Sequence, residues 1–357
     1  MIFTMRGEGS MMNRSGTGNS IAVIGAGAVG AVVAALVSEA GYNVEIVCKH
    51  ADLAERIRTE GIHLTGAKGE HRVAMPAVAD VAELKETKDI IFLATKATDM
   101  LEVAEELLPF LKDTSVVVSL QNGICEDALG GIIGRDRIVG CVVGWGSTMH
   151  SPGEIEMTST GEFVIGTIDN RPDPRLRSIA EMLNTVAPVE ISSNIMGSLY
   201  AKLIINSCIT SLGAVCGLYL GEMLSKKKIR AIFIEIMREA MAVADAMGLR
   251  VEEYGGKINY YTLLRGAGFF DNLKRHLLIR MIGFKYRRLK SSSLQSLERG
   301  KPTEIDFLNG YIVAKGEEYT VSVPVNRRIV QMIKEIEEKK REISPDNFND
   351  PVFSSFT

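Results

Sequence analysis

Lys202 and Asn206 have side-chain types and a spacing that could protonate and hold a carbonyl compound. Lys202 precedes the apolar run 203–205 and, on a helix, would share one face with Asn206 and Thr210. Aliphatic neighbours partly desolvate a lysine, and this lowers the pKa of its ammonium group toward that of a useful general acid. Such a cation would also attract a carboxylate. The alternative is a lysine that reaches from an amphipathic helix into solvent.

Glu304 and a run of three serines are further candidates toward the end of the chain. Glu304 follows Pro302 and Thr303. An acid in the first turn of a helix that Thr303 caps would need no ligand to explain it. Ser292, the middle serine of residues 291–293, is either part of a linker or a hydroxyl that contacts a substrate. The residues alone leave both readings open.

A glycine-rich turn near the N-terminus has the pattern of a dinucleotide-binding loop. It follows the apolar run 21–24, which predicts a strand, and it opens an alanine-rich helical stretch. The first glycine would permit a tight turn, the second would let the backbone approach a pyrophosphate, and the third would let helix and strand pack closely. The predicted cofactor-binding residues here are Gly25, Ala26, Gly27, Ala28, Val29 and Gly30. A glycine-rich turn that binds nothing is the alternative.

Three polar residues at the ends of later strands are candidates for cofactor contacts. Lys49 follows the strand predicted at 44–48, and its cation suits a 2′-phosphate better than a 2′-hydroxyl, so we predict NADP rather than NAD. The acid of this strand, Glu45, lies inside it and not at its end. A merely solvated Lys49 is the alternative. Lys96 and Asn122 lie where two further strands end, which is the edge where such sheets bind ligands. Asn122 also fits an ordinary Asn-Gly turn.

Short apolar runs that alternate with helical segments predict an α/β fold for the first half of the chain. Near-continuous Val/Ile runs indicate strands buried on both faces of a parallel sheet. These runs are residues 21–24, 44–48, 90–94, 116–120 and 138–143. Residues 153–158 and 163–168 are typical of a hairpin, which we place at an antiparallel edge of the sheet.

Long helical segments dominate after about residue 190, so the predicted fold is a Rossmann-type parallel-sheet domain followed by a mostly α-helical domain. We expect the ligand cleft between the two. The helical segments are residues 194–216, 226–247, 307–315 and 325–340. The predicted boundaries are a flexible extension at 1–19, an NADP-binding domain at 20–190, a helical substrate and catalytic domain at 191–345 and a tail at 346–357.

Composition and charge narrow the function classes. The 357 residues are 46% hydrophobic and 24% charged, which is ordinary for a globular protein. The 41 basic and 44 acidic residues nearly balance, which argues against general nucleic-acid binding. The five cysteines form no CxxC pair or Cys/His cluster with zinc spacing, so we predict no metal site. Free thiols in odd number and the lack of a secretory signal favour the cytoplasm.

Two stretches raise the question of a membrane. The run 203–221 is long enough to cross a bilayer, but it contains several polar residues and begins at Lys202, so we predict a buried helix and no span. The segment 255–290 is unusually basic. It contains a cluster of cations toward its end, namely Lys274, Arg275, Arg280, Lys285, Arg287, Arg288 and Lys290. A solvated helical face is the favoured interpretation; an anionic substrate, a partner or an anionic membrane surface are alternatives.

Several motifs occur in the order and with the character seen in ketopantoate reductases (2-dehydropantoate 2-reductases). They are GAGAVG, the lysine of ATKATD, QNG, KLIINS, SSSLQ and PTEIDFLNG. The chain resembles that family over most of residues 20–340. The resemblance implies a Rossmann domain joined to a helical domain like that of 6-phosphogluconate dehydrogenase. It also implies NADPH-dependent reduction of a 2-oxo acid to a 2-hydroxy acid.

The resemblance further implies a role for each candidate. Lys202 would be the general acid, and Asn206 would bind the substrate and position the lysine. Ser292 would bind the substrate carboxylate. Glu304 would act in catalysis by orienting the substrate hydroxyls and would line the cofactor site. The remaining cofactor contacts would be Lys96 and Asn122.

The expected reaction is the reduction of ketopantoate to pantoate, in pantothenate and coenzyme A biosynthesis, by a cytoplasmic enzyme that is a candidate homodimer. Thr210 stands where the family often has a second asparagine, so a different 2-oxo acid or an imine is the alternative substrate. A non-catalytic NADP-binding sensor is the alternative from another class, but it leaves Lys202, Asn206 and Glu304 without a purpose.

Overall fold

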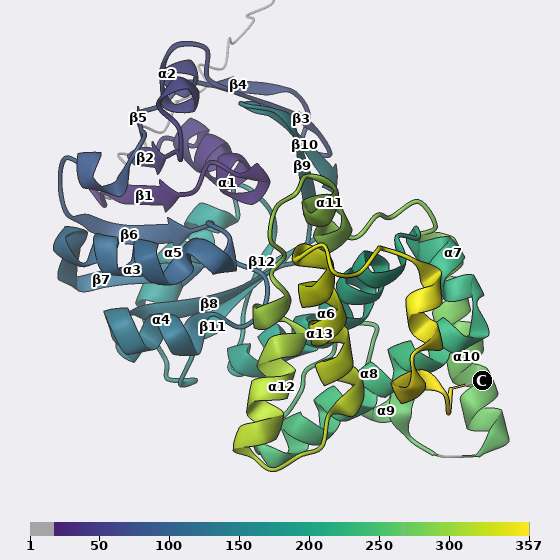
Figure 1. Cartoon of the computed structure of the whole chain (residues 1–357). Coiled ribbons are helices and arrows are strands. Elements are labelled where there is room, and N and C mark those ends of the chain that lie inside the picture. Colours follow the sequence, from purple (N-terminus) through teal and green to yellow (C-terminus); the bar gives the residue numbers. More distant parts are fainter. Residues whose placement is uncertain (1–17, 267, 357) are drawn as a thin grey trace, which may run out of the picture.

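The computed structural model describes residues 18–266 and 268–356, which form an α/β part followed by a helical part (Figure 1). The predicted N-terminal extension lies almost wholly outside the described residues. The main sheet has eight strands among the described residues, in the order β12-β11-β8-β7-β6-β1-β2-β5. These strands are β1 (Ile21–Ile24), β2 (Val44–Val47), β5 (Ala77–Val78), β6 (Lys88–Leu93), β7 (Leu111–Ser119), β8 (Ile138–Val143), β11 (Phe163–Thr167) and β12 (Val189–Ile191).

The central strands pair in parallel, as the apolar runs predict, because helices cover both faces of the sheet. All six residues of β8 are buried. The helices of this part are α1 (Ala28–Glu39), α2 (Ala51–Thr59), α3 (Met100–Leu107), α4 (Glu126–Ile133) and α5 (Arg175–Leu183). The carboxyl ends of β1, β6, β7 and β8 therefore meet at one edge, where the predicted cofactor residues lie.

The predicted hairpin of residues 153–158 and 163–168 is wrong. The first segment belongs to a second sheet, in the order β4-β3-β10-β9, while β11 pairs antiparallel with β8 in the main sheet. The strands of the second sheet are β3 (Ile62–Gly66), β4 (His71–Val73), β9 (Gly146–Ser151) and β10 (Glu154–Ser159). The chain changes sheets at Gly161, where a Cβ atom would overlap the backbone of Gly144. This close approach directs β11 away from β10.

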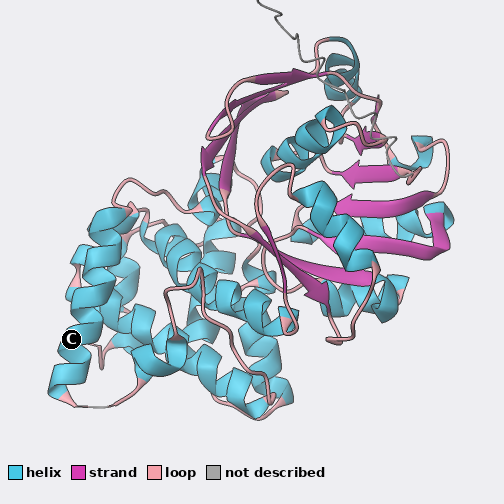
Figure 2. Cartoon of the chain, turned by 180° about the vertical axis from the view of Figure 1, so that it is seen from behind, coloured by secondary structure: helices cyan, strands magenta, loops and turns pink. Residues whose placement is uncertain are grey.

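The second part of the chain is helical and packs against the β8–β11 edge of the main sheet (Figure 2). Its helices are α6 (Ile195–Cys216), α7 (Leu220–Ser225), α8 (Lys227–Ala246), α9 (Tyr260–Leu264), α10 (Phe269–Lys285), α11 (Ser292–Glu298), α12 (Asn309–Glu318) and α13 (Pro324–Glu337). The fold class that the sequence predicts, a Rossmann-type sheet followed by a helical domain, is confirmed.

Helix α6 is the centre of the helical part. It is long and apolar enough to cross a membrane, but 83% of its most apolar window is buried among α8, α11, α13 and β8. Asn194 caps its start by accepting a hydrogen bond from Gly197, and Gly217 ends it with φ +73°. The segment 346–357, set apart as a tail in the sequence, adds Phe348 and Phe353 to the same core.

The basic segment differs from the solvated, charged helical face that the sequence favours. Residues 269–285 do form a helix, but large apolar side chains occupy much of its solvent side. The exposed apolar residues of this region are Phe269, Phe270, Leu273, Leu277, Leu278, Met281, Phe284, Tyr286 and Leu289. In the sequence these apolar residues are interleaved with seven Lys and Arg residues, and only their exposure in the structure distinguishes them from a buried face.

Candidate active site

The glycine-rich turn between β1 and α1 has the geometry of a pyrophosphate cradle. Gly25 has φ +105°, and a Cβ there would lie 2.9 Å from the backbone of Ala94 in the neighbouring chain segment. A Cβ on Gly30 would overlap the carbonyl oxygen of Gly25. A Cβ on Gly27, in contrast, would meet no protein atom within 4 Å. Two glycines are thus required by the protein itself, while the space at Gly27 is open for a ligand.

The N-terminus of α1 suits an anion, because no side chain caps it and its first turn carries no acid. The three remaining turn residues, Ala26, Ala28 and Val29, present backbone N–H groups in this region. The residues present therefore fit a dinucleotide phosphate. This fit rests on the steric pattern of the three glycines and on the uncapped helix end.

Lys49 lies at the end of β2, next to Asp99. Its Nζ atom is 3.1 Å from Asp99 Oδ2, and 78% of the lysine side chain is exposed. Partial burial opposes ionisation of Asp99, but hydrogen bonds from Lys49 and Thr98 hold the pKa of this carboxyl below its usual value. Glu45 is not available to a ribose, because its carboxylate pairs with buried Lys88 at 2.8 Å. The exposed cation at the strand end is thus consistent with a 2′-phosphate.

Lys96 and Asn122 follow β6 and β7, and both loops meet the helical part. Lys96 Nζ lies 3.5 Å from Ser296 Oγ and 3.4 Å from the carbonyl oxygen of Pro302. Asn122 is exposed. Its neighbour Gly123 has φ +84°, and a Cβ there would overlap the carbonyl oxygen of Phe307. The two cofactor candidates therefore lie where the sheet edge and the 302–307 segment touch.

Lys202 lies in the first half of α6 and reaches the carboxyl end of β8. Its Nζ atom donates a 2.9 Å hydrogen bond to the carbonyl oxygen of Val143. Burial lowers the pKa of the ammonium group, and the nearby Cys141, Glu304 and Glu126 oppose this shift. The amine has three N–H groups, so this hydrogen bond leaves donors for a substrate. The reading of Lys202 as a lysine extended into solvent does not fit this geometry.

Glu304 joins the two parts of the molecule. Its Oε1 atom accepts a 3.0 Å hydrogen bond from the backbone N–H of Ala97 at the end of β6. Burial raises the pKa of the Glu304 carboxyl, whereas the Ala97 N–H and the charges of Lys96 and Lys202 oppose the rise. Thr303 accepts a 3.3 Å hydrogen bond from the Ile305 N–H, but the element that follows is only a short 3-10 helix (Ile305–Phe307), and Glu304 rather than Thr303 stands at its N-cap position. The expected position of Glu304 in the first turn of a helix capped by Thr303 is therefore wrong.

Asn206, Thr210 and Ser292 lie on the two helices that form the other side of the site. Asn206 is half-buried and Thr210 is buried, one and two turns after Lys202 on α6. Ser292 is exposed as the first residue of α11. The preceding Ser291 is the helix cap and accepts a 3.0 Å hydrogen bond from Leu294. Helices α6 and α11 are in contact, so these hydroxyl and amide groups belong to neighbouring surfaces.

Glu126 is a site residue that the sequence analysis missed. It is the first residue of α4, directly after the QNG loop, and it is 1% exposed. Burial raises the pKa of its carboxyl to about 7, although hydrogen bonds from backbone N–H groups and Ser119 favour the charged form. Its charge acts on Lys202 and Cys141. The sequence signal that could have found it is an acid three residues after Gly123, preceded by the apolar pair Ile124 and Cys125.

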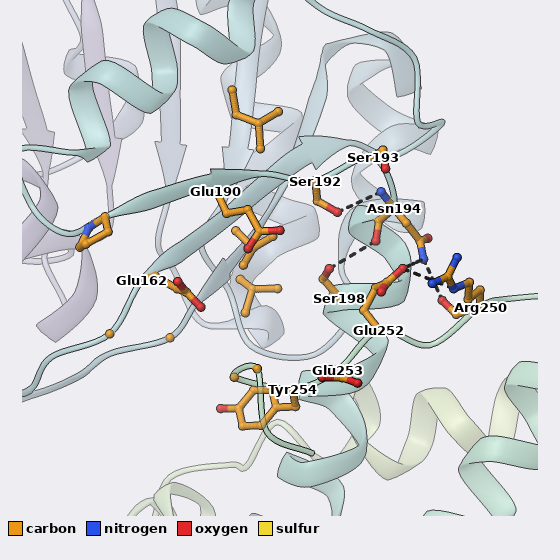
Figure 3. Close-up of a pocket in the computed structure, with 18 residues that line it drawn as sticks. Glu162, Glu190, Ser192, Ser193, Asn194, Ser198, Arg250, Glu252, Glu253 and Tyr254 are labelled. Atoms are coloured by element: carbon orange, nitrogen blue, oxygen red, sulfur yellow. Dashed lines mark hydrogen bonds and ion pairs between the residues drawn. The ribbon is translucent and has the colours of Figure 1, made fainter. Parts of the chain in front are cut away.

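A large cavity among the described residues lies away from these candidates. Its volume is about 770 Å³, and it lies between the ends of β8, β11 and β12, the start of α6 and the 250–256 loop (Figure 3). None of the residues that line it is a predicted site residue. Asn194 donates hydrogen bonds to Glu252 Oε1 at 2.6 Å and to the carbonyl oxygen of Arg250. Figure 3 shows that these bonds connect the start of α6 to the 250–256 loop on one side of the cavity. Residues of both parts of the chain line this cavity.

The fold and the site define an NADP-dependent oxidoreductase that acts on a CH–OH group. Family models described as "Ketopantoate reductase PanE/ApbA" and "Ketopantoate reductase PanE/ApbA C terminal" match residues 21–170 and 194–337. The chain belongs to the ketopantoate reductase PanE/ApbA family. The predicted family, enzyme class and cofactor class, NADPH/NADP, are thereby confirmed.

Relatives and solved structures agree with this assignment. The 2-dehydropantoate 2-reductase of Archaeoglobus fulgidus is 29% identical over 325 residues, which are 89% of this chain and 97% of the relative. The corresponding protein of Pyrococcus horikoshii is 27% identical, over 88% of this chain and 96% of its own length. A ketopantoate reductase of Ralstonia eutropha JMP134 has a TM-score of 0.77 at 29% identity and covers 90% of this chain and 100% of its own. D-mandelate dehydrogenase with NADH and anilino(oxo)acetate shares the fold, with a TM-score of 0.76 at 20% identity, over 90% and 98% of the two chains.

Proposed function

We propose that this enzyme reduces 2-dehydropantoate to pantoate with NADPH and that Lys202 is the general acid. The observation that supports this most is the reach of the Lys202 ammonium group to the Val143 carbonyl, at the sheet edge that also carries the glycine turn. The relatives named 2-dehydropantoate 2-reductase, which match nearly the whole chain, support the choice of substrate. The pathway, the cytoplasmic location, a homodimeric state and the domain boundaries at residues 190 and 345 belong to the same proposal.

In this reaction the cofactor provides the hydride, and side chains of the helical part provide the proton and orient the substrate. Bound NADPH supplies a hydride to the keto carbon. Lys202, held by Val143, gives a proton from Nζ to the keto oxygen as that oxygen gains charge, which is the contribution of a positioned general acid. The lowered pKa of Lys202 makes this transfer easier. Glu304, fixed by Ala97, accepts a hydrogen bond from the substrate hydroxyl beside the lysine.

The other candidates hold the two ligands. Asn206, on the same helix as Lys202, positions the lysine and binds the substrate. The Ser292 hydroxyl at the start of α11 binds the substrate carboxylate. The glycine turn binds the pyrophosphate, and Lys49 binds the 2′-phosphate. The cofactor contacts on the intervening loops are Lys96 and Asn122.

A variant of Lys202 tests the catalytic assignment. Lys202→Ala should reduce kcat with NADPH and ketopantoate by about two to four orders of magnitude, the usual contribution of a positioned acid. NADPH affinity, measured by fluorescence titration, should stay nearly unchanged. The matched control is Lys340→Ala, which removes an exposed lysine that pairs with Glu338 at the surface. Unchanged turnover of Lys202→Ala would refute the role of the lysine.

Thr210 favours a second candidate function, the reduction of a different 2-oxo acid or of an imine. It is buried in α6 at the position where the family resemblance implies an asparagine, so the site has one amide fewer for a substrate. A panel of 2-oxo acids with NADPH separates the candidates, since the preferred substrate has the highest kcat/KM. NADPH binding without turnover on any of these compounds would instead indicate the non-catalytic sensor.

A further inference from the structure

Helix α10 turns an apolar stripe toward solvent. Large side chains recur at helical spacing along it, and the most exposed are Phe269 at 76%, Phe270 at 74%, Phe284 at 72% and Met281 at 68%. Leu273 and Leu277 lie between them and are also exposed. A surface helix of a globular protein usually presents charged and polar residues on that side. Contiguous exposed apolar side chains of this size mark an interaction surface.

The opposite face of α10 is anchored, so the stripe cannot simply rotate inward. Arg275 is 2% exposed and donates to the backbone carbonyls of Leu263 at 2.8 Å and Arg265 at 2.9 Å. One turn further, Ile279 is buried. Gly283 packs so closely on α7 that a Cβ would lie 2.7 Å from Leu224 Cβ. These contacts on the buried face of α10 therefore keep its apolar stripe exposed to solvent.

Cations border this stripe. On a helix of 3.6 residues per turn, Lys274 and Lys285 lie along one edge of it and Arg280 lies near the other. Arg287 stacks over the ring of Phe284, with 5.3 Å from its Cζ atom to the ring centroid. The lysine run 226–228, at the start of the adjacent α8, extends the positive surface.

The charge of this region is opposite to that of the rest of the chain. Residues 269–290 contain seven Lys and Arg residues and a single acid, Asp271. The other residues contain 34 basic and 43 acidic side chains. Two copies of the chain that met through α10 about a two-fold axis would bring like charges together. An anionic surface complements both the apolar stripe and its positive border.

We propose that α10 docks the enzyme on the surface of a membrane that contains anionic phospholipids. The helix would lie parallel to the membrane, with its Phe, Leu and Met side chains among the acyl chains and its Lys and Arg side chains at the headgroups. Helix α10 lies at the outer edge of the helical part, far from the main sheet (Figures 1 and 2). Docking therefore leaves the site between the two parts open to water-soluble ligands.

Sedimentation with lipid vesicles tests this docking. We expect the full chain to bind vesicles that mix phosphatidylcholine with phosphatidylglycerol at least about tenfold more tightly than pure phosphatidylcholine vesicles, and to be released by high salt, which screens the cations. The variant with Phe269→Ser, Phe270→Ser and Phe284→Ser should bind anionic vesicles at least about tenfold more weakly. Replacement of exposed Leu101 on α3 by serine is the matched control and should bind like the wild type. All these proteins should keep their turnover in solution, because the changed residues lie outside the site.

Two results would overturn the docking proposal. The first is equal binding of the wild-type chain to both kinds of vesicle, or no binding to either, which needs no variant. The second is a dimer in analytical ultracentrifugation that the triple phenylalanine variant splits into monomers, since the stripe would then be covered by a second copy of the chain.

Discussion

Replacement of Glu126 by glutamine should reduce the decrease in the free energy of unfolding that occurs as the pH rises. The unfolded chain releases this proton near the ordinary pKa of 4.5, whereas burial raises the pKa of the Glu126 carboxyl in the folded protein to about 7. The contribution of the neutral carboxyl is thus fully present below pH 4.5 and is lost as the pH rises through about 7. A shift of about 2.5 units corresponds to about 3 kcal/mol in the free energy of unfolding. Glutamine does not titrate, so it removes this loss.

Urea denaturation from about pH 5 to about pH 8 measures the effect in both proteins. The difference in free energy of unfolding between Glu126→Gln and the wild type should change by about 2.5 kcal/mol in favour of the variant across this range, because part of the shift is already lost at pH 5. Asp127→Asn is the control, because it removes the next acid along the chain, which pairs with Arg135 at the surface. If the curves of Glu126→Gln and wild type stay parallel, Glu126 titrates as an ordinary carboxyl and the burial argument fails.

Three further changes test the cofactor site and the sheet. Lys49→Asp should raise the KM for NADPH about tenfold or more, with little effect on NADH, because a charge-assisted hydrogen bond to phosphate is lost; an unchanged preference would remove Lys49 from the site. Gly30→Ala should lower the free energy of unfolding by about 1–3 kcal/mol, and with it the thermal midpoint, because the new Cβ overlaps the turn. Gly27→Ala should leave the thermal midpoint unchanged and weaken NADPH binding. Equal stability of both variants would contradict this. Lys88→Met should cost about 3–5 kcal/mol in urea denaturation, because it leaves Glu45 buried without its partner; a loss below about 1 kcal/mol would contradict this.

Much of the main sheet could be predicted because most of its strands are short apolar runs that can be recognised in the sequence without knowledge of their partners. Strand β8 is a run of six buried residues, and its observed bounds equal the predicted ones. The second sheet was out of reach, since β3 and β4 are short and half-polar. Their pairing is also non-local: His63 of β3 lies beside Glu154 of β10. A hairpin was the simplest local interpretation of residues 153–168, and tertiary pairing overrode it.

Site residues could be predicted where the residue type and the spacing of a motif point to the same chemistry. They could not be predicted where the role of a side chain depends on its burial in the folded protein. Lys202 and Glu304 were named from their motifs, and the structure brings the charges of both to the same sheet edge. Ser292 and Asn122 are exposed, so their roles depend on a ligand and stay predictions. Glu126 was missed because one acid after a turn is ordinary in a sequence, and only three-dimensional packing removes it from water.

The placement of Phe348 and Phe353 has a consequence for synthesis of the protein. Both side chains complete the core around α6 and α13, yet they follow every α-helix of that core in the sequence. The α/β half can fold while the chain is still being made, as N-terminal domains do. The helical half cannot complete its core until residues 348 and 353 have been synthesised, so a chain cut after residue 345 would have one finished domain and one unfinished.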